Sequence, residues 1–68
     1  MNDETFNTSI RKFLKIVGVN SQREIEQAVA QAIASGKLVG NETFAVKVTL
    51  EIPSLQFAAG FDGDIKLE

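Results

Sequence analysis

The chain contains no cysteine and no histidine, and these absences exclude several kinds of chemistry. A disulfide requires cysteine, and zinc sites in proteins are built mainly from cysteine and histidine. The usual pairs of nucleophile and base also need one of the two residues. The remaining carboxylates, lysines, serines and threonines form no catalytic spacing and no glycine-rich phosphate loop. The sequence therefore predicts a protein that is not an enzyme and that holds no cofactor and no metal.

Strong positive charge and long apolar runs are missing as well. The net charge is −2, whereas modules that bind the phosphate backbone are usually strongly basic, so nucleic acid is disfavoured as a partner. No apolar run approaches the roughly 20 residues of a membrane-spanning helix. The opening sequence MNDETFN is acidic and polar, unlike a secretory signal. We expect a soluble, cytoplasmic protein without membrane contact.

The strongest pattern in the chain is the stretch Thr43 to Ile52, TFAVKVTLEI. Its apolar residues recur at every second position, which is typical of a strand that is packed on one face and wet on the other. These residues are Phe44, Val46, Val48, Leu50 and Ile52. The apolar face of this strand needs a cover from elsewhere in the chain.

Two helical patterns precede the strand. The first runs from about Asp3 to Val17, with Asn2 or Asp3 as its N-terminal cap and Gly18 as its stop. Its apolar stripe consists of Phe6, Ile10, Phe13, Leu14 and Val17. The second begins at Ser21, which forms an S-x-x-E capping box with Glu24, and ends at Gly36. Its stripe consists of Ile25, Ala28, Val29, Ala32 and Ile33.

The residues after the long strand predict a second one. Residues 37–42 form a loop with a turn at Gly40-Asn41, and Pro53 ends the first strand because it cannot donate to a ladder. Apolar and charged residues alternate from Phe61 to Glu68, which favours an antiparallel partner strand. Residues 54–60 fit a strand, a helical turn or a loop.

The predicted fold class is therefore α+β, a single α-α-β-β domain over residues 1–68, with two amphipathic helices packed on one face of an antiparallel β-hairpin. The expected core comprises Phe6, Ile10, Phe13, Leu14, Val17, Ile25, Val29, Ile33, Phe44, Val46, Val48, Leu50, Ile65 and Leu67.

A protein partner is the function class that the sequence favours. A two-stranded sheet has two open edges, and isolated hairpins are marginally stable in water. We expect a homodimer, formed by strand pairing or helix packing, or a complex with another protein. Apolar residues off the helical stripes, Ile16, Ala30 and Ala34, point the same way. The alternative is a compact monomer in which the segment from Leu55 to Phe57 closes the sheet.

A winged-helix DNA-binding protein is the second hypothesis. Gly18-Val19-Asn20-Ser21 resembles the turn of a helix–turn–helix, and the hairpin would be the wing. Base contacts would come from Arg23, Gln27 and Gln31, and phosphate contacts from Arg11, Lys12 and Lys15. Leu14 stands where that motif prefers a small residue, the glycine-to-isoleucine spacing is one residue long, and Glu24 and Glu26 add negative charge to the reading helix.

A calcium loop at Asp62-Gly63-Asp64 is a weaker hypothesis. The segment, even with Glu68, lacks the further oxygen ligands and the glycine–glutamate spacing of an EF-hand. Alternating charges on the wet face of a strand explain these residues better.

Three segments carry a resemblance to a known family: MNDETFNTSIRKFLKIVGVNSQREIE at the start, A-x-ASGKL-x-GNET from Ala32 to Thr43, and the long strand followed by an acidic one. At full length the chain resembles a family of short, uncharacterised proteobacterial proteins. The resemblance implies one small domain with two helices followed by strands. It implies no assigned activity and no functional residues.

Overall fold

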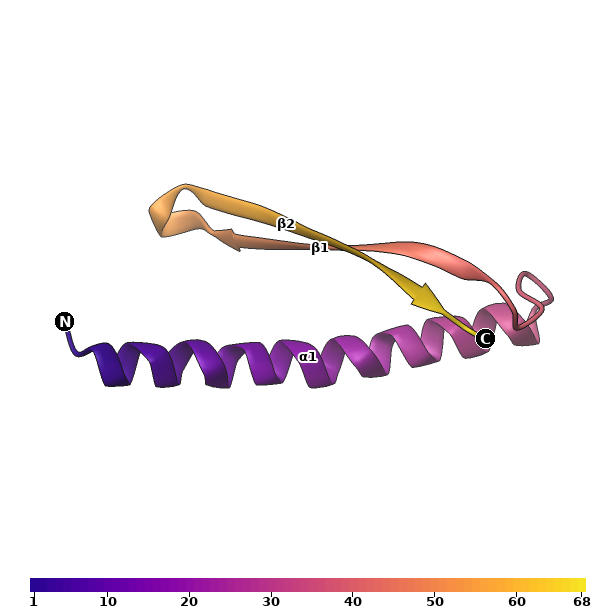
Figure 1. The fold of residues 1–68 in the computed structure, drawn as a ribbon, viewed down its shortest axis with the longest axis horizontal. Coiled ribbons are helices and arrows are strands. Elements are labelled where there is room, and N and C mark those ends of the chain that lie inside the picture. Colours follow the sequence, from indigo (N-terminus) through magenta and orange to yellow (C-terminus); the bar gives the residue numbers. More distant parts are fainter. The chain divides into compact units, whose positions relative to one another are not determined.

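The computed structural model describes all 68 residues and contains one helix followed by a β-hairpin (Figure 1). The elements are α1 (Asp3–Ala34), β1 (Thr43–Ile52), the 3-10 turn η1 (Pro53–Leu55) and β2 (Phe57–Lys66). The chain divides into two compact units, Met1–Lys37 and Leu38–Glu68. The predicted α-α-β-β fold is therefore wrong, because a single helix of 32 residues stands where two helices were expected.

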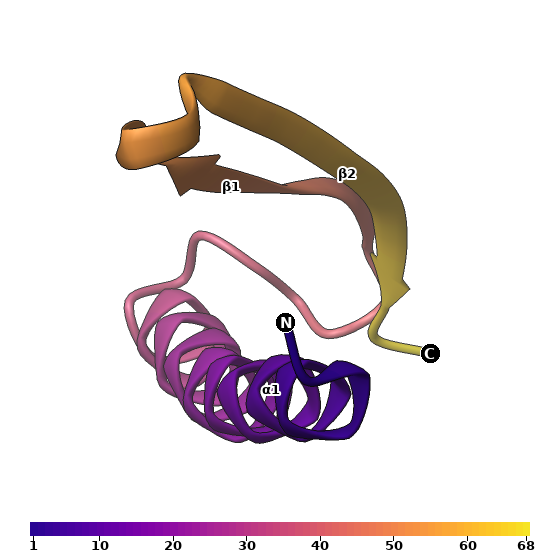
Figure 2. The same cartoon turned by 90° about the vertical axis from the view of Figure 1, so that its left-hand side faces the viewer.

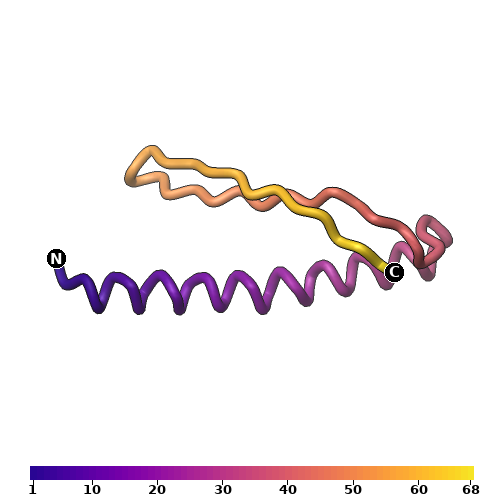
Figure 3. Tube along the Cα trace, in the orientation of Figure 1, coloured from indigo at the N-terminus to yellow at the C-terminus, as the bar shows by residue number.

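The helix continues through Gly18 because nothing in that segment compels it to stop. Glycine inside a helix costs only about 1 kcal/mol relative to alanine, and no proline interrupts α1. Val17, Ser21 and Ile25 follow one another at steps of four residues, so the side of the helix that carries the first stripe also carries the second. The capping box of Ser21 and Glu24 is thus a part of the helix interior, and the trace in Figure 3 shows an unbroken coil here.

Both ends of α1 are closed by local hydrogen bonds. At the N-terminus the Asn2 side chain accepts a hydrogen bond of 3.0 Å from the backbone N–H of Thr5, which confirms Asn2 as the cap. At the C-terminus the Lys37 N–H donates to the Ala32 carbonyl (2.8 Å), and the Gly36 N–H donates to the Ile33 carbonyl (3.1 Å). This pair of bonds is a Schellman motif, and Gly36 adopts the φ of +81° that the motif requires. The predicted stop at Gly36 is confirmed.

Replacing Gly18 by alanine tests the continuity of the helix. A Cβ at position 18 would meet no atom within 4 Å, and the backbone there is helical. We therefore expect Gly18→Ala to stabilise the helical unit by about 1 kcal/mol, measured by thermal melting of the circular dichroism signal at 222 nm. A helix that ended at Gly18 in a left-handed conformation would instead be destabilised by the same change, and that result would contradict the continuous α1.

The hairpin has a regular antiparallel register. Its pairs run from Thr43 opposite Lys66 to Ile52 opposite Phe57, without a bulge. Figure 2 shows the two strands bending and twisting together along their length, as paired strands normally do. The bounds predicted for the first strand are confirmed. The antiparallel second strand is confirmed as well, although it begins at Phe57, four residues before the start of the predicted alternation.

The connection between the strands shows which structure residues 54–60 adopt, for which the sequence allows a strand, a helical turn or a loop. Pro53 opens η1, and the N–H of Gln56 donates to the Pro53 carbonyl at 3.0 Å. Gln56 then adopts a left-handed conformation with φ of 50°, which reverses the chain into β2. A helical turn over the first residues and a strand from Phe57 onward therefore share this segment.

The loop before β1 is organised by one carboxylate. Glu42 accepts hydrogen bonds from the backbone N–H groups of Val39 (2.9 Å) and Gly40 (3.0 Å). Gly40 has a φ of +110°, a conformation that other residues rarely adopt, so the predicted turn at Gly40 is confirmed. The Glu42 carbonyl accepts a further bond of 2.9 Å from the N–H of Leu67, which ties the loop to the end of the hairpin.

These bonds make the loop sensitive to acid. The hydrogen bonds from Val39 and then Gly40 favour the charged carboxylate, so the pKa of Glu42 lies below its ordinary value of 4.5. A lowered pKa in the folded state means that the stabilisation is present above the ordinary value and is lost as the pH falls through the lowered pKa. We expect the protection of the Val39 and Gly40 amides, which is their exchange rate relative to that of an unstructured chain at the same pH, to fall over that range, as measured by NMR.

Glu42→Gln should remove this acid-dependent step and leave both amides weakly protected at every pH. Glu51→Gln on β1 removes the same charge without touching the loop and serves as the control. An unchanged exchange profile in Glu42→Gln would contradict the role of the carboxylate.

Burial is the largest departure from the sequence-based expectation. No residue of the chain is buried, whether apolar or polar. The expected core residues are half-buried or exposed; Phe6, Phe13 and Leu14, for example, each expose about half of their surface. The physical reason is that neither a lone helix nor a two-stranded hairpin has an interior of its own. No helix of the structure combines the length and the apolar character that crossing a membrane requires.

Candidate interaction surface

The first candidate surface is an apolar stripe along α1. Its positions follow one another at steps of three or four residues, so they share one side of the helix. We call these eight positions the α1 stripe: Phe6, Ile10, Phe13, Val17, Ser21, Ile25, Ala28 and Ala32. Leu14, Val29 and Ile33 lie beside it on one flank and widen it. The side chains are large in the N-terminal half and mostly small in the C-terminal half.

The small residues leave a hollow near the C-terminal end of the α1 stripe. Its volume is about 340 Å³. The residues that line it are Ala28, Gln31, Ala32, Ser35 and Lys37. All of them belong to the helical unit, and the floor of the hollow is provided by the two alanines of the stripe.

The second candidate surface is one face of the hairpin. Residues directly opposite each other in the register point to the same side of a sheet. The pairs on this side are Phe44–Ile65, Val46–Gly63, Val48–Phe61, Leu50–Ala59 and Ile52–Phe57. We call these ten residues the apolar hairpin face. Phe61 and Phe57 expose 59% and 46% of their surface, so the face is open to solvent where its largest side chains lie.

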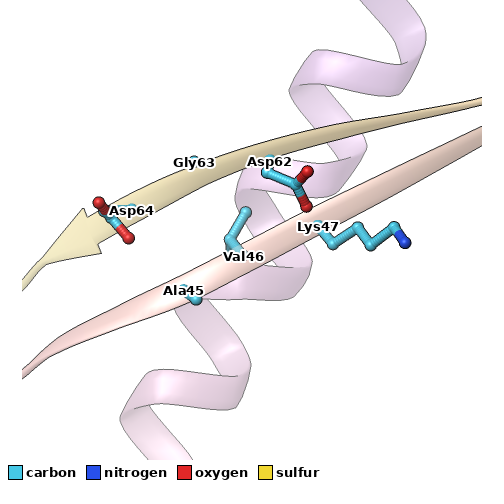
Figure 4. Close-up of a pocket in the computed structure, with 6 residues that line it drawn as sticks. All are labelled: Ala45, Val46, Lys47, Asp62, Gly63 and Asp64. Atoms are coloured by element: carbon cyan, nitrogen blue, oxygen red, sulfur yellow. The ribbon is translucent and has the colours of Figure 1, made fainter.

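The opposite face of the hairpin is polar. Lys47 stands opposite Asp62, and the missing side chain of Gly60 leaves room for the Lys47 stem, whose Cε lies 3.1 Å from the place of a Cβ. Figure 4 shows the shallow hollow at this part of the hairpin, with the carboxylates of Asp62 and Asp64 displayed on β2. No group of three or more metal-binding side chains forms in the chain. The register places Asp62 opposite Lys47 and Asp64 opposite Ala45, so both carboxylates lie on the polar face of the hairpin, as the alternation in the sequence indicates.

The residues proposed for DNA contact all belong to α1 but do not form a helix–turn–helix. Because residues 18–21 are helical, the turn on which that hypothesis was based is absent. The six side chains, all exposed, extend over about 30 Å of the helix surface. They are Arg11, Lys12, Lys15, Arg23, Gln27 and Gln31. No second helix carries or supports a reading element.

Comparison with known proteins gives one match. The model of a family of unknown function, DUF6494, matches residues 1–68. The chain belongs to this family. The DUF6494 match covers every element of both units and confirms the resemblance to a family without an assigned activity. No curated protein and no solved structure matches the chain.

Sequence reasoning missed part of both surfaces. The sequence predicts Ser21 as a cap, although its spacing of four from Val17 and from Ile25 places it on the α1 stripe. Phe57 and Ala59 belong to the segment for which the sequence predicts no single structure, although they continue the alternation of the second strand toward its start. In both places the spacing of the apolar residues continues through a residue type that is common in turns or caps. This continued spacing was the signal that could have found them.

Proposed function

We propose that this DUF6494 chain is a non-enzymatic protein-interaction module that works by assembling with itself. The observation that carries the proposal is the combination of two continuous apolar surfaces with no buried residue anywhere in the chain. Contiguous apolar patches on soluble proteins mark binding surfaces, because their exposure to water is unfavourable. A function through contact is thus better supported than a function through chemistry.

The proposal includes the absence of catalysis and a cytoplasmic location. The residues that commonly carry out nucleophilic or acid–base catalysis are missing from the sequence. The two hollows are shallow, and their lining offers two lysines, two aspartates, one serine and one glutamine among small or apolar residues. The absence of cysteine fits a reducing compartment.

Sedimentation equilibrium over a wide range of concentrations tests the proposal, with circular dichroism measured on the same samples. We expect the mass to be at least that of two chains at micromolar concentration, and helix content to fall when dilution separates the chains. A chain that stays monomeric at millimolar concentration, with protected amides in both units, would contradict it.

A further inference from the structure

The spacing of the α1 stripe is symmetric. The steps between its eight positions run four, three, four, four, four, three and four residues, so the spacing reads the same from either end. A second copy of α1, laid antiparallel with its centre over the same point, therefore places every stripe position opposite another stripe position. Opposed residue numbers add to 38, and the centre falls at residue 19, next to the midpoint of the helix.

The side chains opposed in this register are complementary in size. Larger residues of the N-terminal half meet smaller ones of the C-terminal half of the other copy. The four pairs are Phe6–Ala32, Ile10–Ala28, Phe13–Ile25 and Val17–Ser21, and each occurs twice by symmetry. The hollow of about 340 Å³ over Ala28 and Ala32 is the place where Ile10 and Phe6 of the second copy arrive. Such alternation of large and small residues lets two helices interdigitate without voids.

Charges beside the stripe are complementary in the same register. Arg11 follows Ile10 by one residue and Glu26 follows Ile25 by one residue, so the two charges lie on the same flank of the helix. In an antiparallel pair the same flanks of the two copies face each other. Arg11 of one copy then stands within about 1.5 Å, along the axis, of the level of Glu26 in the other. The symmetry produces this pair twice.

A parallel arrangement lacks these features. It would place Phe6 on Phe6 and Phe13 on Phe13 at one end, and Ala28 on Ala28 and Ala32 on Ala32 at the other. The large side chains would clash between the helices at one end, and the small side chains would leave unfilled space between the helices at the other. It would also bring the like ends of the two helix dipoles together, whereas an antiparallel pair opposes them.

Resting on the proposed function, we propose that the partner of the α1 stripe is the α1 stripe of a second copy, packed antiparallel about residue 19. The resulting interface is isologous, because the same surface of each chain meets its own symmetry mate. The α1 stripe is thus occupied by another copy of this chain. Because each copy uses the same surface, the contact is complete with two helices, and neither stripe remains free to bind a third.

Disulfide trapping tests the register, and the chain offers a background without cysteine. Two full-length variants are prepared, Ile10→Cys and Ala28→Cys, and are oxidised separately and as a mixture. A disulfide forms only when the two Cα atoms come within about 7 Å. Positions 10 and 28 lie about 27 Å apart along one helix, so neither variant can bridge to its own kind in the antiparallel pair.

We expect the mixture to give the mixed disulfide at least about tenfold in excess of either symmetric one, as measured by mass spectrometry. A dominant 10–10 or 28–28 disulfide would overturn the antiparallel register and leave self-assembly intact. A dimer by sedimentation without any of these disulfides would also overturn the register, because the contact would then lie on the hairpin or at another register of α1. A monomer without disulfides would overturn the proposed function itself.

Charge exchange gives an independent measure. Exposed ion pairs contribute modestly, so we expect Arg11→Glu or Glu26→Arg to raise the dimer Kd about tenfold, and the double exchange to restore it. Arg23→Glu makes the same change in net charge on the side of α1 away from the stripe and should alter the Kd by less than about twofold. Equal effects of Arg11→Glu and Arg23→Glu would overturn the pairing of Arg11 with Glu26.

Discussion

Val48→Asp is expected to abolish the folded hairpin. Val48 lies in the middle of β1, opposite Phe61 on the apolar hairpin face. Val48 exposes 44% of its surface in the single chain. If the apolar hairpin face is covered in the proposed assembly, a carboxylate there replaces a covered apolar side chain by an unpaired charge, at a cost of roughly 3 kcal/mol or more. A chain of 68 residues without a buried core has no reserve of that size. The loss is measured as collapse of the strand amide dispersion in an NMR spectrum.

The matched control is Thr49→Asp. Thr49 is the next residue of the same strand, stands opposite Gly60 and points to the polar face. Aspartate is a poor strand former at either position, so Thr49→Asp should cost about 1 kcal/mol and leave the hairpin folded. A Val48→Asp protein that folds as well as the Thr49→Asp protein would show that the faces of the sheet are assigned wrongly.

Phe13→Asp is expected to raise the dissociation constant of the assembly by at least about a hundredfold. Phe13 lies in the N-terminal half of the α1 stripe, where the side chains are large, and it exposes about half of its surface in the single chain. Burial of an aromatic side chain stabilises by about 2 to 3 kcal/mol, and a symmetric contact contains the residue twice. Sedimentation velocity at a series of concentrations measures the change.

Gln27→Asp provides the comparison for this effect. Gln27 lies outside the stripe, on the flank of α1 opposite to that of Arg11 and Glu26, and aspartate there follows Arg23 by four residues, a spacing at which the two charges attract. Its dissociation constant should stay within about threefold of the unchanged protein. A Phe13→Asp protein that assembles equally well would place the contact elsewhere in the chain and leave the stripe without a role.

The two turns of the chain show where sequence reasoning succeeded. Gly36 and Gly40 were assigned correctly because their positive φ values are conformations that glycine adopts without strain. The strand Thr43–Ile52 was assigned correctly because ten residues of strict alternation fit no helix. At these positions the local pattern, a glycine at a turn or a strict alternation of apolar residues, is compatible with only one structure.

Gly18 and Ser21 show where sequence reasoning failed. Both residues are permitted at helix ends, but neither is excluded from a helix interior, so their presence did not establish an end. The continuity of Val17, Ser21 and Ile25 was the stronger signal, because it relates residues on both sides of the supposed turn. The helix–turn–helix expected at these residues is wrong, because it required two helices held at an angle. Contact of the six residues with DNA stays a prediction.

The interaction surfaces could be foreseen only in part. The apolar residues of α1 and β1 can be identified from the sequence, but the core predicted from them is not seen, because no residue of the chain is buried. Whether an apolar residue is buried depends on what packs against it. The sequence of the stripe does not reveal whether its packing partner belongs to the same chain or to another. The self-complementary spacing became visible only when the helix was known to be continuous.

The absence of any buried residue also bears on thermal behaviour. The heat-capacity change of unfolding and the denaturant m-value both follow the apolar area that unfolding exposes, and a lone chain has little to expose. Its melting would be shallow and gradual. Assembly adds the missing area, so the melting temperature should rise with concentration by mass action. If the chain assembles with itself as proposed, its stability therefore depends on its own concentration as well as on its sequence.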